Sequence, residues 1–123
     1  MNVFLWILQG VVTVAMLAAG AGKLGQPREK LAPKMPWVES FTDGQVKSIG
    51  AVEVLGGLGL VLPAVTDIAP ILTPIAAVGI ALTMLGAALT HARRNEYAQI
   101  APSLVLFALA AVIAWGRFGP YSF

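Results

Sequence analysis

The chain has 123 residues, of which 58% are hydrophobic and 11% charged, and its formal net charge is +2. Soluble domains carry about 25% charged residues, so this composition excludes a water-covered globular enzyme or nucleic-acid-binding domain. The absence of cysteine excludes disulfide and thiol chemistry, and the single histidine excludes a two-histidine metal site. Neither a bound metal nor a nucleic-acid partner is expected. The length predicts one domain, residues 1–123, with about four spans of about 20 residues.

The first predicted span covers residues 3–22, without the basic leader of a signal peptide. Gln9 and Thr13 fall at helical spacing on one face, which is expected to pack on another helix. Gly22 forms a small-xxx-small pair with Ala18, a pattern that favours close helix contact. Lys23 closes the span, where its ammonium group can reach the lipid head groups.

Residues 25–41 form the longest polar connection, and three prolines prevent a continuous helix there. One helical turn is expected over 28–32, after Pro27. Trp37 lies in a short apolar patch and is predicted to anchor at the membrane interface. We therefore predict an interfacial flap between the first two spans.

The second predicted span covers 43–62. Thr42 and Gln45 have the spacing of a capping box, and Pro63 is expected to end the helix. Glu53 is the one ionisable residue between 49 and 62. An unpaired charge in hydrocarbon costs about 2.5 kcal/mol or more, so Glu53 requires a partner or a function.

Glycines gather in the second span, but no strand precedes them and the GxGxxG spacing of a nucleotide-binding loop is missing. Close packing between helices explains them better, and the same role is predicted for a glycine of the third span. The predicted packing glycines are Gly22, Gly56, Gly57, Gly59 and Gly79.

The third and fourth predicted spans cover 68–90 and 98–116. Pro70 and Pro74 fall in the first turns of the third span, so a helix that starts at Pro74 and is capped by Thr73 is an open alternative. Together the four spans predict an all-α, integral membrane four-helix bundle with a cytoplasmic interfacial flap between helices one and two.

Lysine and arginine concentrate between the first and second spans and, as Arg93 and Arg94, between the third and fourth. The positive-inside rule therefore places both polar connections in the cytoplasm and both termini outside, in a plasma (inner) membrane. The aromatic residues predicted to lie at the two membrane interfaces are Trp6 and Trp115 outside, and Trp37 and Tyr97 inside.

This topology brings Lys23, Glu53, His91 and Arg93 into the cytoplasmic half of the bundle. Two interpretations are open: an ion pair that holds two helices together, or the polar floor of a pocket for a small ligand or a proton. A lone histidine is more often an interfacial residue than a catalytic base. Arginines in such a loop are typical topology signals and head-group contacts.

Three stretches, AGAGKL at 19–24, IGAVEVLGGLGLVLP at 49–63 and LGAALTHARRNE at 85–96, resemble the DoxX-like membrane proteins. The resemblance covers nearly the whole chain and implies a four-helix membrane bundle. The characteristic polar positions of the family correspond to Lys23, Glu53 and His91. Relatives are associated with thiosulfate:quinone oxidoreductase subunits, with redox or oxidative-stress complexes, and with assembly of other proteins. Lack of cysteine separates this chain from redox-active proteins of similar topology.

Two functional hypotheses follow from the resemblance. The first is a membrane subunit associated with a quinone-linked oxidoreductase or with a redox or oxidative-stress complex. A quinone or another small hydrophobic ligand would bind near Glu53, and no intrinsic cofactor is expected. The second is a non-enzymatic interaction or assembly factor, and a transporter component ranks third. Catalysis by the isolated chain is not expected. Lipid, a redox-enzyme or other membrane-protein partner and a second copy of the chain are the candidate partners.

Overall fold

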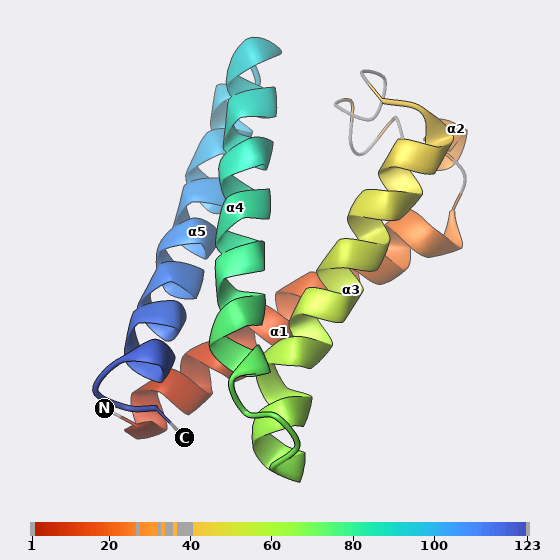
Figure 1. Cartoon of the computed structure of the whole chain (residues 1–123). Helices are drawn as coiled ribbons and strands as arrows, with labels where there is room; N and C mark the ends of the chain where they lie inside the picture. Colours follow the sequence, from red (N-terminus) through yellow and green to blue (C-terminus); the bar gives the residue numbers. More distant parts are fainter. Residues whose placement is uncertain (1, 27, 32, 34–35, 37–40, 123) are drawn as a thin grey trace.

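In the computed structural model, four long helices form a bundle and a single short helical turn lies between the first two (Figure 1). The structure describes residues 2–26, 28–31, 33, 36 and 41–122, and no strand occurs among them, which confirms the all-α class. The helices are α1 (Asn2–Gly25), α2 (Arg28–Leu31), α3 (Asp43–Thr66), α4 (Leu72–Arg93) and α5 (Tyr97–Phe118).

All four long helices have the length and the hydropathy needed to cross a membrane. Large apolar side chains cover their outward faces, and Leu55, Leu82 and Val105 are typical examples, each more than half exposed. Apolar surface of this extent is not stable against water. The chain is therefore a multi-pass membrane protein whose outer surface contacts lipid.

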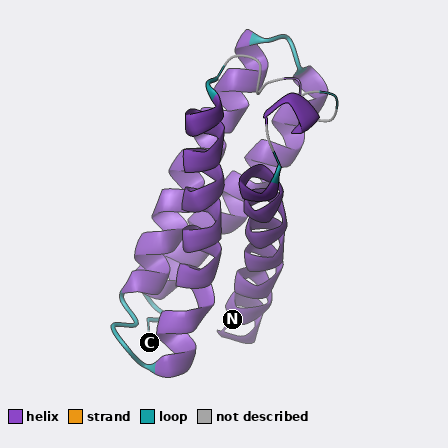
Figure 2. Ribbon diagram, turned by 90° about the vertical axis from the view of Figure 1, so that its right-hand side faces the viewer, coloured by secondary structure: helices purple, strands orange, loops and turns teal. Residues whose placement is uncertain are grey.

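The four helices close into a ring of neighbours, in which α1 packs along α3 and α4 packs along α5, while α3 also contacts α4 and α1 also contacts α5. Figure 1 shows that the two pairs approach each other at the end that holds both termini and diverge toward the end that carries α2. The turned view in Figure 2 shows the long helices running along the length of the molecule.

The hydrophobic core occupies the half of the bundle near the termini, where the two pairs meet. All four long helices contribute apolar side chains to it: Leu8, Val12, Met16, Leu60, Ala77, Ile80, Ala81, Met84, Ala110 and Ile113. Met16 and Met84 come from the middle of their helices, so they mark the inner limit of the packed half.

The beginning of α3 agrees with the sequence, because both bonds of the predicted capping box are present. The Gln45 amide N–H donates to Thr42 Oγ1 at 3.1 Å, and the Thr42 N–H donates to Gln45 Oε1 at 2.9 Å. The predicted end at Pro63 is wrong, since α3 continues to Thr66. Pro63 removes only one backbone hydrogen bond of the helix, which ends at Thr66 and is followed by Asp67 in the left-handed region, with φ of 58°.

Helix α4 begins at Leu72, so the predicted start at residue 68 is wrong, and so is the alternative start at Pro74 with Thr73 as cap. Pro74 lies in the first turn, where a backbone N–H has no helical partner and its loss is tolerated. The turn expected over 28–32 is present as α2. Trp37 and about half of the predicted flap lie outside the described residues.

Candidate functional site

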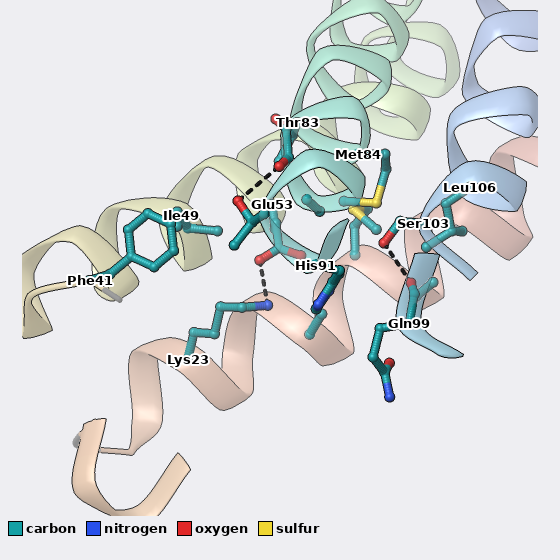
Figure 3. Close-up of a pocket in the computed structure, with 16 residues that line it drawn as sticks. Lys23, Phe41, Ile49, Glu53, Thr83, Met84, His91, Gln99, Ser103 and Leu106 are labelled. Carbon is teal, nitrogen blue, oxygen red and sulfur yellow. Dashed lines mark hydrogen bonds and ion pairs between the residues drawn. The ribbon is translucent and has the colours of Figure 1, made fainter. Parts of the chain in front are cut away.

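A cavity of about 490 Å³ lies between the helices, in the half of the bundle where the two pairs diverge (Figure 3). Every long helix contributes to its wall. The apolar part of the wall consists mainly of Ala15, Met16, Ala19, Phe41, Ile49, Met84, Ala87 and Leu106. The polar side chains that line it are Lys23, Glu53, Thr83, Thr90, His91, Gln99 and Ser103.

The strongest interaction at the cavity is the ion pair between Lys23 of α1 and Glu53 of α3. The distance from Lys23 Nζ to Glu53 Oε1 is 2.7 Å, and the two side chains are only 7% and 4% exposed. Because water screens such a pair poorly at this depth, the attraction is stronger than that of a surface pair. The pair joins two helices that are distant in sequence.

Two glycines allow α1 and α3 to approach closely enough for this ion pair. A Cβ at Gly20 would lie 2.6 Å from the Gly50 carbonyl oxygen, and a Cβ at Gly50 would lie 2.8 Å from Lys23 Cβ. Neither position therefore accepts a side chain without movement of the backbone or of Lys23. The small residues bring the lysine stem directly against α3.

A second lysine fixes the carboxyl end of α1. Lys47 Nζ donates to the carbonyl oxygens of Lys23, Leu24 and Gln26 at 3.3, 3.2 and 3.2 Å. The last carbonyls of a helix lack partners within the helix and carry partial negative charge, so an ammonium group stabilises them. Lys47 thus holds the turn that contains Lys23.

His91 reaches the cavity from α4, and its ring is held by Glu96, the residue that precedes α5. His91 Nδ1 lies 2.9 Å from Glu96 Oε1, and Arg94 Nε donates to Glu96 Oε2 at 3.1 Å. The Glu96 N–H also donates to the His91 carbonyl oxygen at 2.8 Å. Asn95, with φ of 57°, makes the tight turn that brings these groups together.

Glu96 is charged in this arrangement. The hydrogen bond from His91, with further help from Arg94, holds the pKa of Glu96 below its ordinary value of 4.5, although partial burial acts in the opposite direction. An ionised carboxylate only accepts hydrogen bonds, so the hydrogen lies on His91 Nδ1. This contact fixes both the tautomer and the orientation of the imidazole.

The predicted polar residues separate into two groups. Lys23, Glu53 and His91 all line the cavity. Arg93 is exposed near the end of α4 and does not contribute to the wall. Two polar side chains of α5, Gln99 and Ser103, belong to the site but were not predicted, because a polar residue at the start of a span resembles an ordinary interfacial residue.

The predicted packing glycines also form two groups, those that lie against a neighbouring helix and those that do not. A Cβ at Gly56 would lie 2.9 Å from Ile80 Cγ1, one at Gly59 would lie 2.9 Å from Ala76 Cβ, and one at Gly57 would lie 3.3 Å from Met16 Cβ. The close contact predicted at Gly22 and Gly79 is wrong. No heavy atom of the described neighbours lies within 4 Å of a Cβ built at either position, because both face away from the adjacent helix.

A second polar cluster lies at the end of the bundle near the termini. Arg117 is 2% exposed. Its Nε donates to Gln9 Oε1 at 2.8 Å, and Gln9 Nε2 in turn donates to the Leu60 carbonyl oxygen at 2.6 Å. Arg117 Nη1 donates to Asn2 Oδ1 at 2.5 Å and to the Tyr121 carbonyl oxygen at 2.9 Å.

This cluster was not predicted as a unit. The sequence analysis placed Gln9 on a packing face, whereas Arg117 is simply the basic residue that follows the fourth predicted span, 98–116. The polar Gln9 within an apolar span was the available signal, since such a residue needs a partner.

Of the predicted anchors, Trp6 lies against Arg117, with the guanidinium carbon 5.5 Å from the ring centroid. Trp115 and Tyr97 are more than half exposed.

The comparison with protein families finds the model of the DoxX-like family, which matches residues 7–113. The match covers most of the chain, so this protein belongs to the DoxX-like family. Neither the curated proteins nor the solved structures include a match.

Proposed function

We propose that this DoxX-like protein binds a small apolar molecule with a polar head group between its helices, as the membrane subunit of a quinone-linked oxidoreductase. The observation that carries the proposal is the position of the Lys23–Glu53 pair and of His91 on the wall of one cavity. The volume of about 490 Å³ falls within the range of about 300–1,000 Å³ typical of small-molecule sites.

The distribution of polarity supports a ligand more than a purely structural ion pair. A pair that only joins α1 to α3 needs no space beside it, whereas here Glu53 borders a cavity with wall residues from α4 and α5. The remaining wall is largely apolar, which suits an aromatic ring, and the surrounding lipid suits a hydrocarbon tail. Quinones combine these features with oxygen atoms that bind polar side chains.

The electron-transfer chemistry is assigned to a partner subunit. The chain has no cysteine, and the polar groups at the cavity can bind, orient and exchange protons with a ligand. The proposed contribution of this protein is therefore to hold the quinone at a defined depth in the membrane. Relatives associated with quinone-linked enzymes are consistent with this division of labour.

The test is binding of 2-methyl-1,4-naphthoquinone to the purified protein in detergent, measured by equilibrium dialysis, with native mass spectrometry of the ligand that copurifies. Ala87→Leu fills part of the cavity and should weaken binding, because Ala87 lines the wall. Ala108→Leu on the exposed face of α5 is the matched control and should bind as the unaltered protein does.

Absence of binding by the unaltered protein, together with absence of any copurified quinone, would overturn the proposal. Equal binding by Ala87→Leu and Ala108→Leu would show that the ligand does not occupy this cavity. A stoichiometric membrane-protein partner that copurifies without quinone would instead support the role of assembly factor.

A further inference from the structure

Glu53 offers hydrogen-bond acceptors to the cavity. Its side chain is 4% exposed, and Lys23 is its partner through one carboxylate oxygen. An ionised carboxylate has about four acceptor positions on its two oxygens. In the described part of the chain the buried Oε1 of Glu53 lacks a well-aligned hydrogen-bond donor although Lys23 Nζ lies close to it, and Figure 3 shows Glu53 among the residues that line the cavity. A buried acceptor without a donor is costly, so a ligand with a donor gains by supplying one.

The hydroxyl groups on the wall also present acceptors, because their hydrogens are already used within the helices. Thr83 Oγ1 donates to the Gly79 carbonyl oxygen at 2.8 Å, and Thr90 Oγ1 donates to the Gly86 carbonyl oxygen at 2.9 Å. On α5, Ser103 Oγ donates to the Gln99 carbonyl oxygen at 3.1 Å. A hydroxyl has one hydrogen and two lone pairs, so each of these oxygens can only accept from a ligand.

His91 adds an acceptor of a third kind. With the Nδ1 hydrogen directed to Glu96, the imidazole in its neutral form has a lone pair on Nε2 that can accept a hydrogen bond. The described part of the chain gives Nε2 no hydrogen-bonding partner, and the side chain lines the cavity. Among the described residues, the side-chain donors that remain on the wall are the Lys23 ammonium, one of whose N–H groups is directed to Glu53, and the Gln99 amide. Acceptors therefore predominate.

From this imbalance we infer that the cavity selects a ligand that donates hydrogen bonds, namely a hydroquinone or a related hydroxyl-bearing aromatic molecule, over the corresponding quinone. The inference rests on the proposed function, whose ligand class it narrows to the reduced form. A hydroquinone supplies an O–H group to Glu53 and another to the His91 or hydroxyl side of the wall. A quinone has acceptors only and leaves those positions without partners.

The experiment compares three ligands of nearly equal size in the unaltered protein. They are 2-methyl-1,4-naphthohydroquinone, kept reduced by excess dithionite without oxygen, the parent naphthoquinone without dithionite, and the dimethyl ether of the hydroquinone. Equilibrium dialysis in detergent gives each Kd. We expect the hydroquinone to bind at least about tenfold more tightly than the other two, since a hydrogen bond to a charged group contributes at least this much. The ether retains the ring but cannot donate.

Two variants test whether Glu53 is the source of the preference for the hydroquinone. Glu53→Gln replaces a carboxylate by a group that also donates, so the preference for the hydroquinone over the ether should fall severalfold. Asp67→Asn makes the same chemical change in the link between α3 and α4, away from the cavity, and should leave the preference unaltered. The comparison in the unaltered protein remains decisive if Glu53→Gln does not fold.

Each outcome has a distinct meaning. Equal binding of the three ligands, or tighter binding of the quinone, would overturn the selectivity and leave the proposed function in place. Binding of none would overturn the proposed function and the selectivity with it. A tenfold preference that is identical in Glu53→Gln and the unaltered protein would overturn the assignment of Glu53 as the acceptor.

Discussion

At the scale of single residues, the contact between Lys23 and Glu53 determines much of the behaviour of the site. The same two side chains join α1 to α3 and border the cavity. The two interpretations of the sequence, a structural ion pair and a pocket floor, are therefore compatible in one geometry. The ion pair itself is present, whereas occupation of the cavity is the part that binding experiments test.

Glu53→Gln should destabilise the protein in detergent without added ligand. The change leaves the Lys23 ammonium without its counter-charge in a buried position, and removal of one partner of a buried pair costs about 3–5 kcal/mol. Lys23 lies near the end of α1 and can turn toward the head groups, so we expect about 3 kcal/mol or less. Thermal unfolding measures the difference.

The matched control removes both charges. Lys23→Met combined with Glu53→Leu leaves no unpaired charge and keeps the volume, so it should recover most of the stability lost in Glu53→Gln. A melting temperature of Glu53→Gln equal to that of the unaltered protein would contradict a stabilising role for the pair.

The contact between Glu96 and His91 leads us to expect that the stability of the fold decreases in acid. Its pKa in the folded protein is held below 4.5 by the hydrogen bond from His91. The charged form therefore stabilises the fold above that value, and the contribution is lost as the pH falls through the lower pKa of the folded state. Glu96→Gln should flatten this acidic loss of stability, measured as melting temperature against pH. Identical acid profiles for the two proteins would exclude the His91–Glu96 contact as its source.

At the scale of elements, glycines determine how closely neighbouring helices approach. Gly56 and Gly59 face Ile80 and Ala76 of α4, and each has room for no more than its hydrogen. Glycine in a helix is otherwise unfavourable by about 1 kcal/mol relative to alanine. Close contact between the helices offsets this cost, since small residues allow backbones to pack tightly in a membrane.

Gly59→Leu should lower the melting temperature in detergent, by an amount that corresponds to about 1–3 kcal/mol of overpacking. Gly79→Leu is the matched control on α4. A Cβ at Gly79 meets open space, so this variant should melt close to the unaltered protein. Equal destabilisation by the two substitutions would contradict the assignment of Gly59 to the contact with α4.

The features of the helices that the sequence predicted correctly are those that depend on interactions between neighbouring residues. The Thr42–Gln45 capping box was correct because its two hydrogen bonds involve neighbouring residues. The end of α3 was predicted wrongly because Pro63 removes only one bond of a helix whose other contacts continue to Thr66. Local patterns thus identified the start of this helix better than its end.

The direction in which a residue faces could be predicted less well. The spans are apolar on all sides, so periodicity does not distinguish the lipid face from the packed face. For this reason Gly79 was predicted at a contact that it does not make, and Gln99 and Ser103 were not predicted at the cavity. Charge was more informative: Glu53 and Lys23 were expected together because buried charges need partners.

At the scale of the whole molecule, the bundle is packed at one end and hollow at the other. The core lies near the termini, and the cavity lies beyond Met16 and Met84, which contribute to both. Methionine is flexible and polarisable, so these two side chains can adapt to ligands of different shape. The hydrophobic core and the proposed ligand site thus lie in different halves of the same four helices.

The orientation in the membrane is the prediction at this scale. Both termini lie at the same end of the bundle, and the basic residues concentrate in the connections at the other end (Figure 1). The positive-inside rule therefore predicts external termini and a cavity in the cytoplasmic half. Alkaline phosphatase fused to the carboxyl terminus should be active in a bacterial host, and the same enzyme inserted between α4 and α5 should be inactive. The reverse pattern of activity would contradict this topology.

The Arg117 cluster holds the two ends of the described chain close together, so we expect that the order of the helices along the chain can be changed. One guanidinium binds both Asn2 and the Tyr121 carbonyl, so the first and last described turns lie within the reach of a single side chain. A short peptide can therefore join the two ends, and the chain can be opened instead between α1 and α3. The resulting circular permutant should refold to the same bundle, because every interhelical contact is kept while the connectivity changes.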